Sequence, residues 1–276
     1  MKKSRTILLL TAAAVLASAY LIWEDNALTL TEYTYTSPKV TSELDGFKIC
    51  HLSDIHNERF GEKNVRLVGL VAEQLPDIIV ISGDLVDSRH TDVPAALELM
   101  EQLVDIAPVY YVTGNHEERL STAVYGYLME NLLRLGVHLM DGRAEVIEWN
   151  GERINIAGFF DKNDFSPDSA RSLLNESMLN ILVNHRPQFA EQYAEAGFDL
   201  AFSGHAHGGQ VRIPFIGGVI SPDQYFFPKY SEGMHKFGDR ATVISRGIGD
   251  SLLPGRVNNR PEVITVTLSK LNEVNK

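Results

Sequence analysis

Short apolar runs alternate with segments of helical periodicity through the first half of the chain. Apolar strands are expected at residues 47–53, 77–82 and 109–113. Helices are expected at residues 62–74, 94–104 and 123–135. This alternation is typical of an α/β domain with a partly parallel sheet. Wholly apolar strands also suit a sheet that is covered on both faces.

The second half of the chain is richer in expected strands. Residues 144–149 and 153–160 flank Asn150-Gly151, a strong signal for a β-hairpin turn. Further strands are expected at residues 179–183, 200–203, 241–246 and 263–268. The pattern therefore predicts one strand-rich α/β domain, and it contains no internal repeat.

An apolar segment from residue 7 to residue 23 lies between polar flanks. It is near the short end of the ~20 residues that cross a bilayer as a helix. Lys2, Lys3 and Arg5 precede it, and this basic flank predicts a cytoplasmic N-terminus with the rest of the chain on the extracytoplasmic side. We expect a single-pass membrane anchor at residues 1–25, a linker and edge strand at 26–45, and a folded domain at 46–276.

A cleaved signal peptide is the alternative to an anchor, and it would give a secreted protein. Ala17-Ser18-Ala19 imitates the small-x-small cleavage site of such peptides. The apolar segment continues past this site to Trp23, which favours an uncleaved anchor. Tyr20 and Trp23 would suit the membrane–water interface.

Composition and charge narrow the possible functions. Hydrophobic residues make up 44% of the chain and charged residues 22%, as in an ordinary globular protein. The net charge of −11 argues against sequence-independent nucleic-acid binding, which relies on Lys and Arg contacts to phosphates. Nucleic acid is therefore not an expected partner. Cys50, the one cysteine, lies in an apolar run and is expected to be a buried, inert thiol.

Polar side chains follow five of the expected strands. The sequences are Asp54-Ile55-His56, Gly83-Asp84-Leu85-Val86-Asp87, Gly114-Asn115-His116-Glu117, Asn184-His185 and Gly204-His205-Ala206-His207. Ligands of open α/β sheets bind beyond the carboxyl ends of the strands, so these side chains can converge. Imidazoles with carboxylates suit manganese, iron, nickel, cobalt or zinc. Neither a GxSxG elbow nor a Walker A loop is present.

These five blocks, in this order over residues 47–210, resemble the calcineurin-like metallophosphoesterase superfamily. Two stretches, residues 204–212 and 247–261, look closer to a membrane-associated bacterial branch that includes UDP-2,3-diacylglucosamine hydrolase-like proteins. That branch often has threonine between its two histidines. Ala206 departs from this pattern, but it does not occupy a ligand position.

The resemblance implies a fold and a metal centre. The fold would be a four-layer αββα sandwich of two mixed β-sheets flanked by helices, preceded here by a transmembrane helix. Two divalent ions (Mn, Fe, Zn, Ni or Co) would share Asp84 as a bridging ligand. The first ion would also take Asp54, His56 and His207, and the second would also take Asn115, His185 and His205.

The resemblance also implies a reaction. A metal-bound hydroxide would attack phosphorus in line. His116 would stand near the leaving oxygen as a general acid or a transition-state stabiliser, and Asp87 would orient His116. We expect a phosphodiesterase or pyrophosphatase acting on a small or lipid-linked phosphate. A broad phosphomonoesterase is an alternative, and a catalytically silent metal-binding scaffold is an alternative of another class. The physiological substrate and the oligomeric state stay open.

Other candidate residues have structural interpretations. Glu117 and His51 are expected to be structural. Arg212, Arg246 and Arg260 could bind a substrate phosphate, although surface or structural pairing explains each of them equally well. The aromatic run at residues 225–228 could form a loop for a lipid or aromatic group, but we favour core packing or a hairpin edge.

Overall fold

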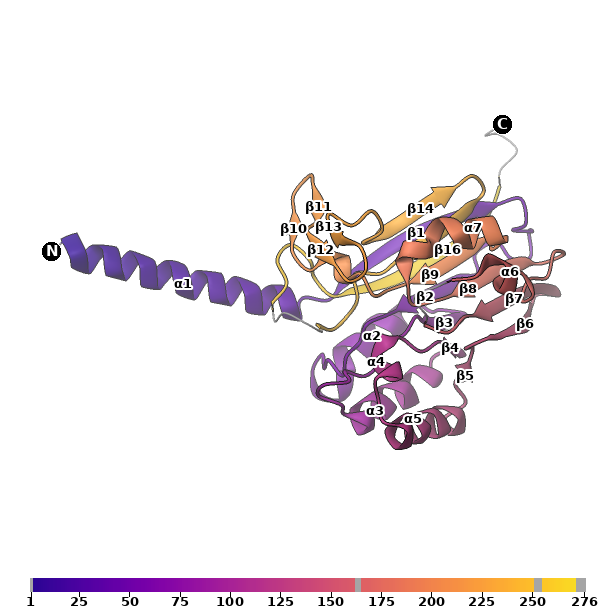
Figure 1. Cartoon of the computed structure of the whole chain (residues 1–276), viewed down its shortest axis with the longest axis horizontal. Helices are drawn as coiled ribbons and strands as arrows, with labels where there is room; N and C mark the ends of the chain where they lie inside the picture. Colours follow the sequence, from indigo (N-terminus) through magenta and orange to yellow (C-terminus); the bar gives the residue numbers. More distant parts are fainter. Residues whose placement is uncertain (1, 162–164, 251–254, 272–276) are drawn as a thin grey trace.

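Two six-stranded mixed β-sheets pack against each other in the computed structural model, which describes residues 2–161, 165–250 and 255–271 (Figure 1). The first sheet has the order β1-β16-β2-β3-β4-β5. Its strands are β1 (Thr29–Ser37), β2 (Lys48–Leu52), β3 (Ile78–Ile81), β4 (Val109–Tyr111), β5 (His138–Leu139) and β16 (Glu262–Lys270). Strands β2 to β5 run parallel, β16 is antiparallel to β2, and β1 is parallel to β16.

The second sheet has the order β14-β15-β9-β8-β7-β6. Its strands are β6 (Arg143–Trp149), β7 (Glu152–Gly158), β8 (Leu179–Val183), β9 (Leu200–Ser203), β14 (Gly233–Phe237) and β15 (Arg240–Ile244). The four central strands are parallel, and the two edge strands are antiparallel to their neighbours. Asn150 and Gly151 form the β6–β7 turn with φ of 49° and 85°, as the Asn-Gly signal predicts.

Helices cover the outer faces of both sheets. The first sheet packs against α2 (Val65–Glu73), α3 (Val93–Val104) and α5 (Thr122–Arg134). The second packs against α6 (Pro167–Arg171) and α7 (Ala190–Ala196). A third apolar cluster fills the space between the sheets, with Val80 and Val266 from one sheet and Ile181 and Val243 from the other. The four-layer αββα fold predicted from the family resemblance is confirmed.

Strands that are buried on both faces carry the clearest sequence signal. All four residues of β3 and all five of β8 are buried, because each strand lies between a helical layer and the opposite sheet. The sequence pattern did not predict several of the short elements: α4 (Asn115–Glu118), β5, α6, α7, β14 and the two-stranded hairpin of β10 (Arg212–Ile213) and β11 (Gly217–Gly218). An element of two to seven residues is too short to establish a period.

For the aromatic run at residues 225–228, we expected core packing or a hairpin edge, and the structure shows the hairpin with exposed side chains. Tyr225–Phe226 forms β13 and pairs with β12 (Ile220–Ser221), so the hairpin is confirmed. Both side chains are exposed, however, and core packing is therefore wrong for this run. Residues 251–254, within the second stretch of the branch resemblance, lie outside the described residues.

Helix α1 (Lys2–Asn26) projects from the domain at one end (Figure 1). Residues 5–26 of this helix are long and apolar enough to cross a membrane, and the helix packs against no core. Its last turns contact the domain. Glu24 Oε2 accepts a hydrogen bond from the Asn259 N–H at 2.9 Å, and Asp25 Oδ1 accepts one from the Arg256 N–H at 2.7 Å.

Candidate metal centre

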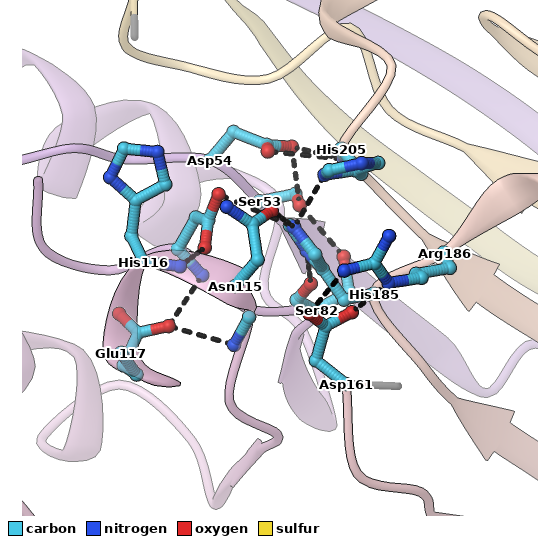
Figure 2. A network of polar contacts seen from close by, with 12 residues as sticks. Ser53, Asp54, Ser82, Asn115, His116, Glu117, Asp161, His185, Arg186 and His205 are labelled. Atoms are coloured by element: carbon cyan, nitrogen blue, oxygen red, sulfur yellow. Dashed lines mark hydrogen bonds and ion pairs between the residues drawn. The ribbon is translucent and has the colours of Figure 1, made fainter. Parts of the chain in front are cut away.

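Side chains from the carboxyl ends of the central strands of both sheets meet in one buried cluster (Figure 2). Two groups in this cluster could each hold a metal ion, with potential ligand atoms within 4.8 Å of one another. They are Asp54–His56–His207 and Asp84–His185–His205. A third group, His56–Asp87–His116, shares His56 with the first. The structure thus brings together all the site residues predicted from the strand ends.

Asp84 belongs to the second group and also faces the first. Its Oδ2 atom is 3.6 Å from His56 Nε2 and 3.3 Å from His185 Nε2. Its Oδ1 atom accepts a hydrogen bond from the backbone N–H of His116 at 2.8 Å, which fixes the carboxylate plane. A single carboxylate oxygen therefore faces imidazoles of both groups, as a bridging ligand requires.

The backbone at the strand ends is in a conformation that few non-glycine residues adopt. Five of the predicted ligands have φ in the left-handed region: Asp54 (50°), His56 (49°), Asp84 (54°), His205 (65°) and His207 (46°). Such conformations cost free energy and persist where the surrounding structure imposes them, often at functional sites. They end the extended backbone after β2, β3 and β9 and begin the loops that carry the ligands. This explains how ligands two residues apart, such as His205 and His207, reach the same cluster.

At two positions the backbone passes so close to the side chains of these ligands that only glycine fits. A Cβ atom at Gly204 would lie 1.8 Å from Ser53 Oγ and 2.3 Å from Asp54 Oδ2. A Cβ atom at Gly114 would lie 2.3 Å from Asp84 Oδ1. The glycines in the predicted blocks therefore let neighbouring loops approach the carboxylates directly.

Two buried carboxylates bind the loops to one another. Asp54 accepts hydrogen bonds from the His205 N–H at 3.0 and 2.9 Å, which links the ends of β2 and β9. Glu117 accepts hydrogen bonds from the backbone N–H groups of Asp84, Val86 and Gly114 at 3.0, 3.1 and 2.7 Å. Burial, with the charge of Asp84 nearby, raises the pKa of Glu117 to about 8. Its contacts are structural, as expected from the sequence.

Asp84 and His185 form a buried pair of opposite charges. Burial opposes the ionisation of both groups, but their mutual attraction outweighs it. His185 holds the pKa of Asp84 well below its usual range. Asp84 in turn raises the pKa of His185 to about 10. His185 Nδ1 donates to the Ser82 carbonyl at 2.7 Å, so Nε2 faces the cluster. A cation between the two side chains would take the place of the Nε2 proton.

The orientation of the Asn115 amide indicates whether a cation fits between Asp84, His185 and His205. Its amide oxygen lies 3.2 Å from His185 Nε2 and 2.8 Å from His205 Nδ1, while its nitrogen points towards Arg119. Hydrogen bonding alone would favour the opposite orientation, with the NH₂ facing the imidazoles. A metal ion favours the oxygen, because amide oxygen and imidazole nitrogen are both ligands. The residues present therefore fit a cation at this position.

His116 is held in one tautomer by the backbone. The Ser88 N–H donates to His116 Nδ1 at 3.0 Å, so the neutral ring carries its proton on Nε2. Burial lowers the pKa of His116, which keeps the ring neutral near pH 7. Asp87 Oδ1 lies 3.4 Å from Nδ1 and accepts a hydrogen bond from the Arg89 N–H at 2.8 Å. Ser88, rather than Asp87, makes the hydrogen bond that orients the imidazole.

A cavity of about 180 Å³ opens onto the cluster. Arg89 and Arg119 line it, together with Asp84, Asn115, His116, His205, His207 and Pro222. The three arginines singled out from the sequence lie elsewhere. Arg212 pairs with Glu232, Arg246 with Glu262 at 2.9 Å, and Arg260 stacks over the Trp23 ring. The sequence pattern gave no reason to choose Arg89 or Arg119, since neither directly follows a strand.

A second set of residues that sequence reasoning missed supports His205. His205 Nε2 lies 2.8 Å from Asp223 Oδ2, which leaves Nδ1 facing His185 at 3.0 Å. Asp223 also contacts Arg186, whose guanidinium makes two hydrogen bonds to buried Asp161 at 2.6 and 2.8 Å. The hydrogen bond from His205 lowers the pKa of Asp223 and keeps it ionised. Arg186 directly follows His185 in the sequence, but nothing in the pattern marks Asp223.

Replacing Asp223 by asparagine is expected to weaken metal binding at the group that contains His205 by about 10- to 100-fold. Asparagine keeps the shape of the side chain but removes the charge that favours a proton on His205 Nε2 and a free lone pair on Nδ1. The measurement is the Mn²⁺ concentration that gives half-maximal activity. A second readout is kcat at saturating Mn²⁺, which should return close to the unmodified value.

Asp168→Asn is the matched control, because it removes one negative charge from an exposed pair with Arg171 that lies outside the cluster. An unchanged Mn²⁺ dependence in Asp223→Asn would show that this contact does not position His205. A loss of activity that no Mn²⁺ concentration restores would also contradict a positioning role.

Comparison with known proteins finds similarity to phosphoesterases, both to a family model and to individual proteins. The family model described as calcineurin-like phosphoesterase matches residues 47–209, more than half of the chain. The uncharacterized metallophosphoesterase YkuE of Bacillus subtilis is 31% identical over 258 residues, covering 90% of this chain and 88% of YkuE. The phosphodiesterase YaeI of Escherichia coli is 30% identical over 227 residues, covering 80% of this chain and 82% of YaeI.

Two further similar proteins have lower sequence identity. A zebrafish (Danio rerio) transmembrane protein with a metallophosphoesterase domain is 28% identical over 284 residues, covering 96% of this chain and 63% of that protein. Among solved structures, TT1561 of Thermus thermophilus superposes with a TM-score of 0.49 at 12% identity, covering 74% of this chain and 90% of the other.

Proposed function

The chain belongs to the calcineurin-like phosphoesterase family, and from this premise we propose that it is a phosphodiesterase or pyrophosphatase acting on a small or lipid-linked phosphate. The chain is a metallophosphoesterase, a hydrolase, and this family uses a dinuclear divalent metal centre. The inactive-scaffold alternative is therefore not retained. The observation that supports phosphoester hydrolysis at this site is a buried, two-group ligand cluster beside a cavity with two arginines and a neutral histidine.

The proposed ligands divide between two ions. Asp54, His56 and His207 would hold the first ion, and Asn115, His185 and His205 the second, with Asp84 shared by both. Two divalent cations at these positions would supply Lewis acidity at the phosphoryl group. The convergence of acceptor atoms around Asp84, and the orientation of the Asn115 amide, support this assignment.

The remaining groups of the cavity would bind the substrate and move a proton. Arg89 and Arg119 present guanidinium donors that fit phosphoryl oxygens. His116 carries its proton on Nε2, so it can donate that proton to the oxygen of the departing group. Asp87, 3.4 Å from the ring, would stabilise the positive charge of His116 whenever the ring is doubly protonated. An alkoxide or phosphate leaving group benefits most from such a donor.

The nature of the substrate rests on two further observations. The related protein YaeI carries the name phosphodiesterase, which favours a diester over a monoester. The apolar helix α1 favours a substrate at a membrane, such as a lipid-linked diphosphate like UDP-2,3-diacylglucosamine. We propose that α1 is an uncleaved anchor and that the catalytic domain lies on the extracytoplasmic side. A broad phosphomonoesterase is the second candidate, because it would use the same metals and ligands.

The test is hydrolysis of bis(p-nitrophenyl) phosphate compared with p-nitrophenyl phosphate by the full chain in detergent. We expect Mn²⁺-dependent cleavage that a chelator abolishes, with a higher kcat/KM for the diester. A higher kcat/KM for the monoester would replace the diesterase proposal by the phosphomonoesterase. The Asp84→Asn variant, prepared in the same way, measures the contribution of contaminating phosphatases.

A further inference from the structure

One exposed apolar surface takes no part in the metal centre. We call residues 212–227 the flap; it contains the hairpins β10–β11 (Arg212–Ile213 and Gly217–Gly218) and β12–β13. Its apolar side chains face outward, and Ile216 and Phe226 expose 63% and 70% of their surface. Phe215, Tyr225 and Phe227 are exposed as well. A contiguous segment with this many exposed aromatic and aliphatic groups marks an interaction surface.

The flap is fixed beside the end of α1 at which that helix joins the domain (Figure 1). The Arg212 N–H donates to the Val257 carbonyl at 2.9 Å, and Asn258 Nδ2 donates to the Arg212 carbonyl at 3.2 Å. Asn258 Oδ1 in turn accepts a hydrogen bond from Tyr20 of α1 at 2.9 Å. One loop therefore holds both the first strand of the flap and the last turns of the helix, so the flap cannot move far from the helix end.

The helix end also indicates the level at which a bilayer would begin. The apolar side chains of residues 7–16 are exposed along α1, whereas the acidic Glu24 and Asp25 bind the domain. Tyr20 and Trp23 lie between these two regions, and Trp23 stacks under the guanidinium of Arg260. Tyr, Trp and Arg at the boundary of an apolar helix are typical of the lipid headgroup level. The flap lies beside this boundary.

We propose that the flap rests in the headgroup region of the same bilayer that α1 crosses, with its exposed aromatic side chains in contact with lipid. The proposal rests on α1 being a membrane anchor, but not on the reaction that the metal centre performs. The net charge of −11 gives no general attraction to anionic lipids, so apolar insertion next to a tethered helix is the contact that these side chains can make.

The flap also forms part of the metal site. Pro222 lines the cavity, and Asp223 bonds to His205. At the other hairpin, the backbone of Gly218 packs against Gly208 and Gly209, which directly follow His207; a Cβ atom at Gly218 would lie 2.6 Å from the Gly208 carbonyl oxygen. The membrane-contacting surface and one wall of the cavity are therefore the same segment, and the cavity lies close to lipid headgroups.

The experiment places a polarity-sensitive fluorophore on the flap through a new cysteine. Burial raises the pKa of the Cys50 thiol to about 12, so the native cysteine will not react in the folded chain. Ile216→Cys and Phe226→Cys, one in each hairpin, are labelled in the full chain. Tyr127→Cys on α5 is the matched control, because Tyr127 is a comparably exposed apolar side chain on a different layer of the fold.

The labelled chains are reconstituted into phosphatidylcholine vesicles that contain lipids with a nitroxide on the acyl chain. We expect blue-shifted emission and at least severalfold stronger nitroxide quenching at positions 216 and 226 than at position 127. Quenching equal to that of the control would overturn the proposal. Blue-shifted emission without quenching would also overturn it, because a second copy of the chain, rather than lipid, would then cover the flap.

Discussion

An Asp84→Asn variant is expected to lose roughly 10³-fold or more in kcat and to bind fewer than two metal ions per chain. The carboxylate faces His56 and His185 with one oxygen, so it is the group that the two proposed ions share. The Lewis acidity of a metal ion lowers the activation barrier by several kcal/mol. Each 1.36 kcal/mol removed from the barrier raises the rate about tenfold. Asparagine tolerates the left-handed φ of 54° at this position, so the backbone should be unaffected.

Metal content after dialysis and kcat with saturating Mn²⁺ are the two measurements. Asp168→Asn again controls for the loss of one carboxylate, because it lies outside both ligand groups. A variant at position 84 that keeps two ions and most of its activity would show that the ions are not bridged by this residue. The thermal unfolding curve shows whether the Asp84→Asn chain is folded. If it is not, Asp84→Ser is measured in its place.

A His116→Gln variant is expected to retain both metal ions while its kcat falls by about 10²- to 10⁴-fold on substrates with poor leaving groups. Glutamine can still donate a hydrogen bond from a similar position, but it cannot give up a proton. The loss should shrink for p-nitrophenyl esters, because p-nitrophenolate departs without a proton. The comparison is a p-nitrophenyl diester against an alkyl diester, measured in the variant and in the unmodified chain.

An equal loss on both substrates would exclude proton donation and leave His116 with an electrostatic role. A drop in metal content would show that His116 is a ligand, as its position in the third group with His56 and Asp87 permits. Ser88→Ala is a useful companion, since the backbone N–H that fixes the tautomer of His116 remains in place. Its kcat should stay within a few-fold of the unmodified value.

The fold was predictable from the sequence where strands are buried on both faces. The continuous apolar run of β3 and the apolar residues 181–183 of β8 suit strands that are covered on both faces, and Asn150-Gly151 specifies its turn through the positive φ of both residues. The four-layer arrangement came from the family resemblance, but the order of strands within each sheet was not predicted, because β16 follows β2 by some 200 residues and pairs with it all the same. Local periodicity carries no information about such distant pairing.

The candidate ligands were also predictable, because they directly follow apolar strands and the carboxyl ends of parallel strands lie together at one edge of a sheet. Asp223 has no such marker. It lies in the flap, between two short hairpins, and reaches His205 only through the tertiary fold. Arg89 and Arg119 belong to the loops after Asp87 and Glu117, and their position at the cavity depends on how those loops turn. The branch resemblance suggested a lipid-linked substrate, and the exposed flap supplies an independent structural reason for a membrane surface.

The position of β16 has a consequence for biosynthesis. The last described strand lies between β1 and β2, so β1 has no partner in the sheet until residues 262–270 have been made. The first sheet therefore completes its fold only after residues 262–270 have been made, and its incomplete edge is exposed to chaperones or aggregation until then.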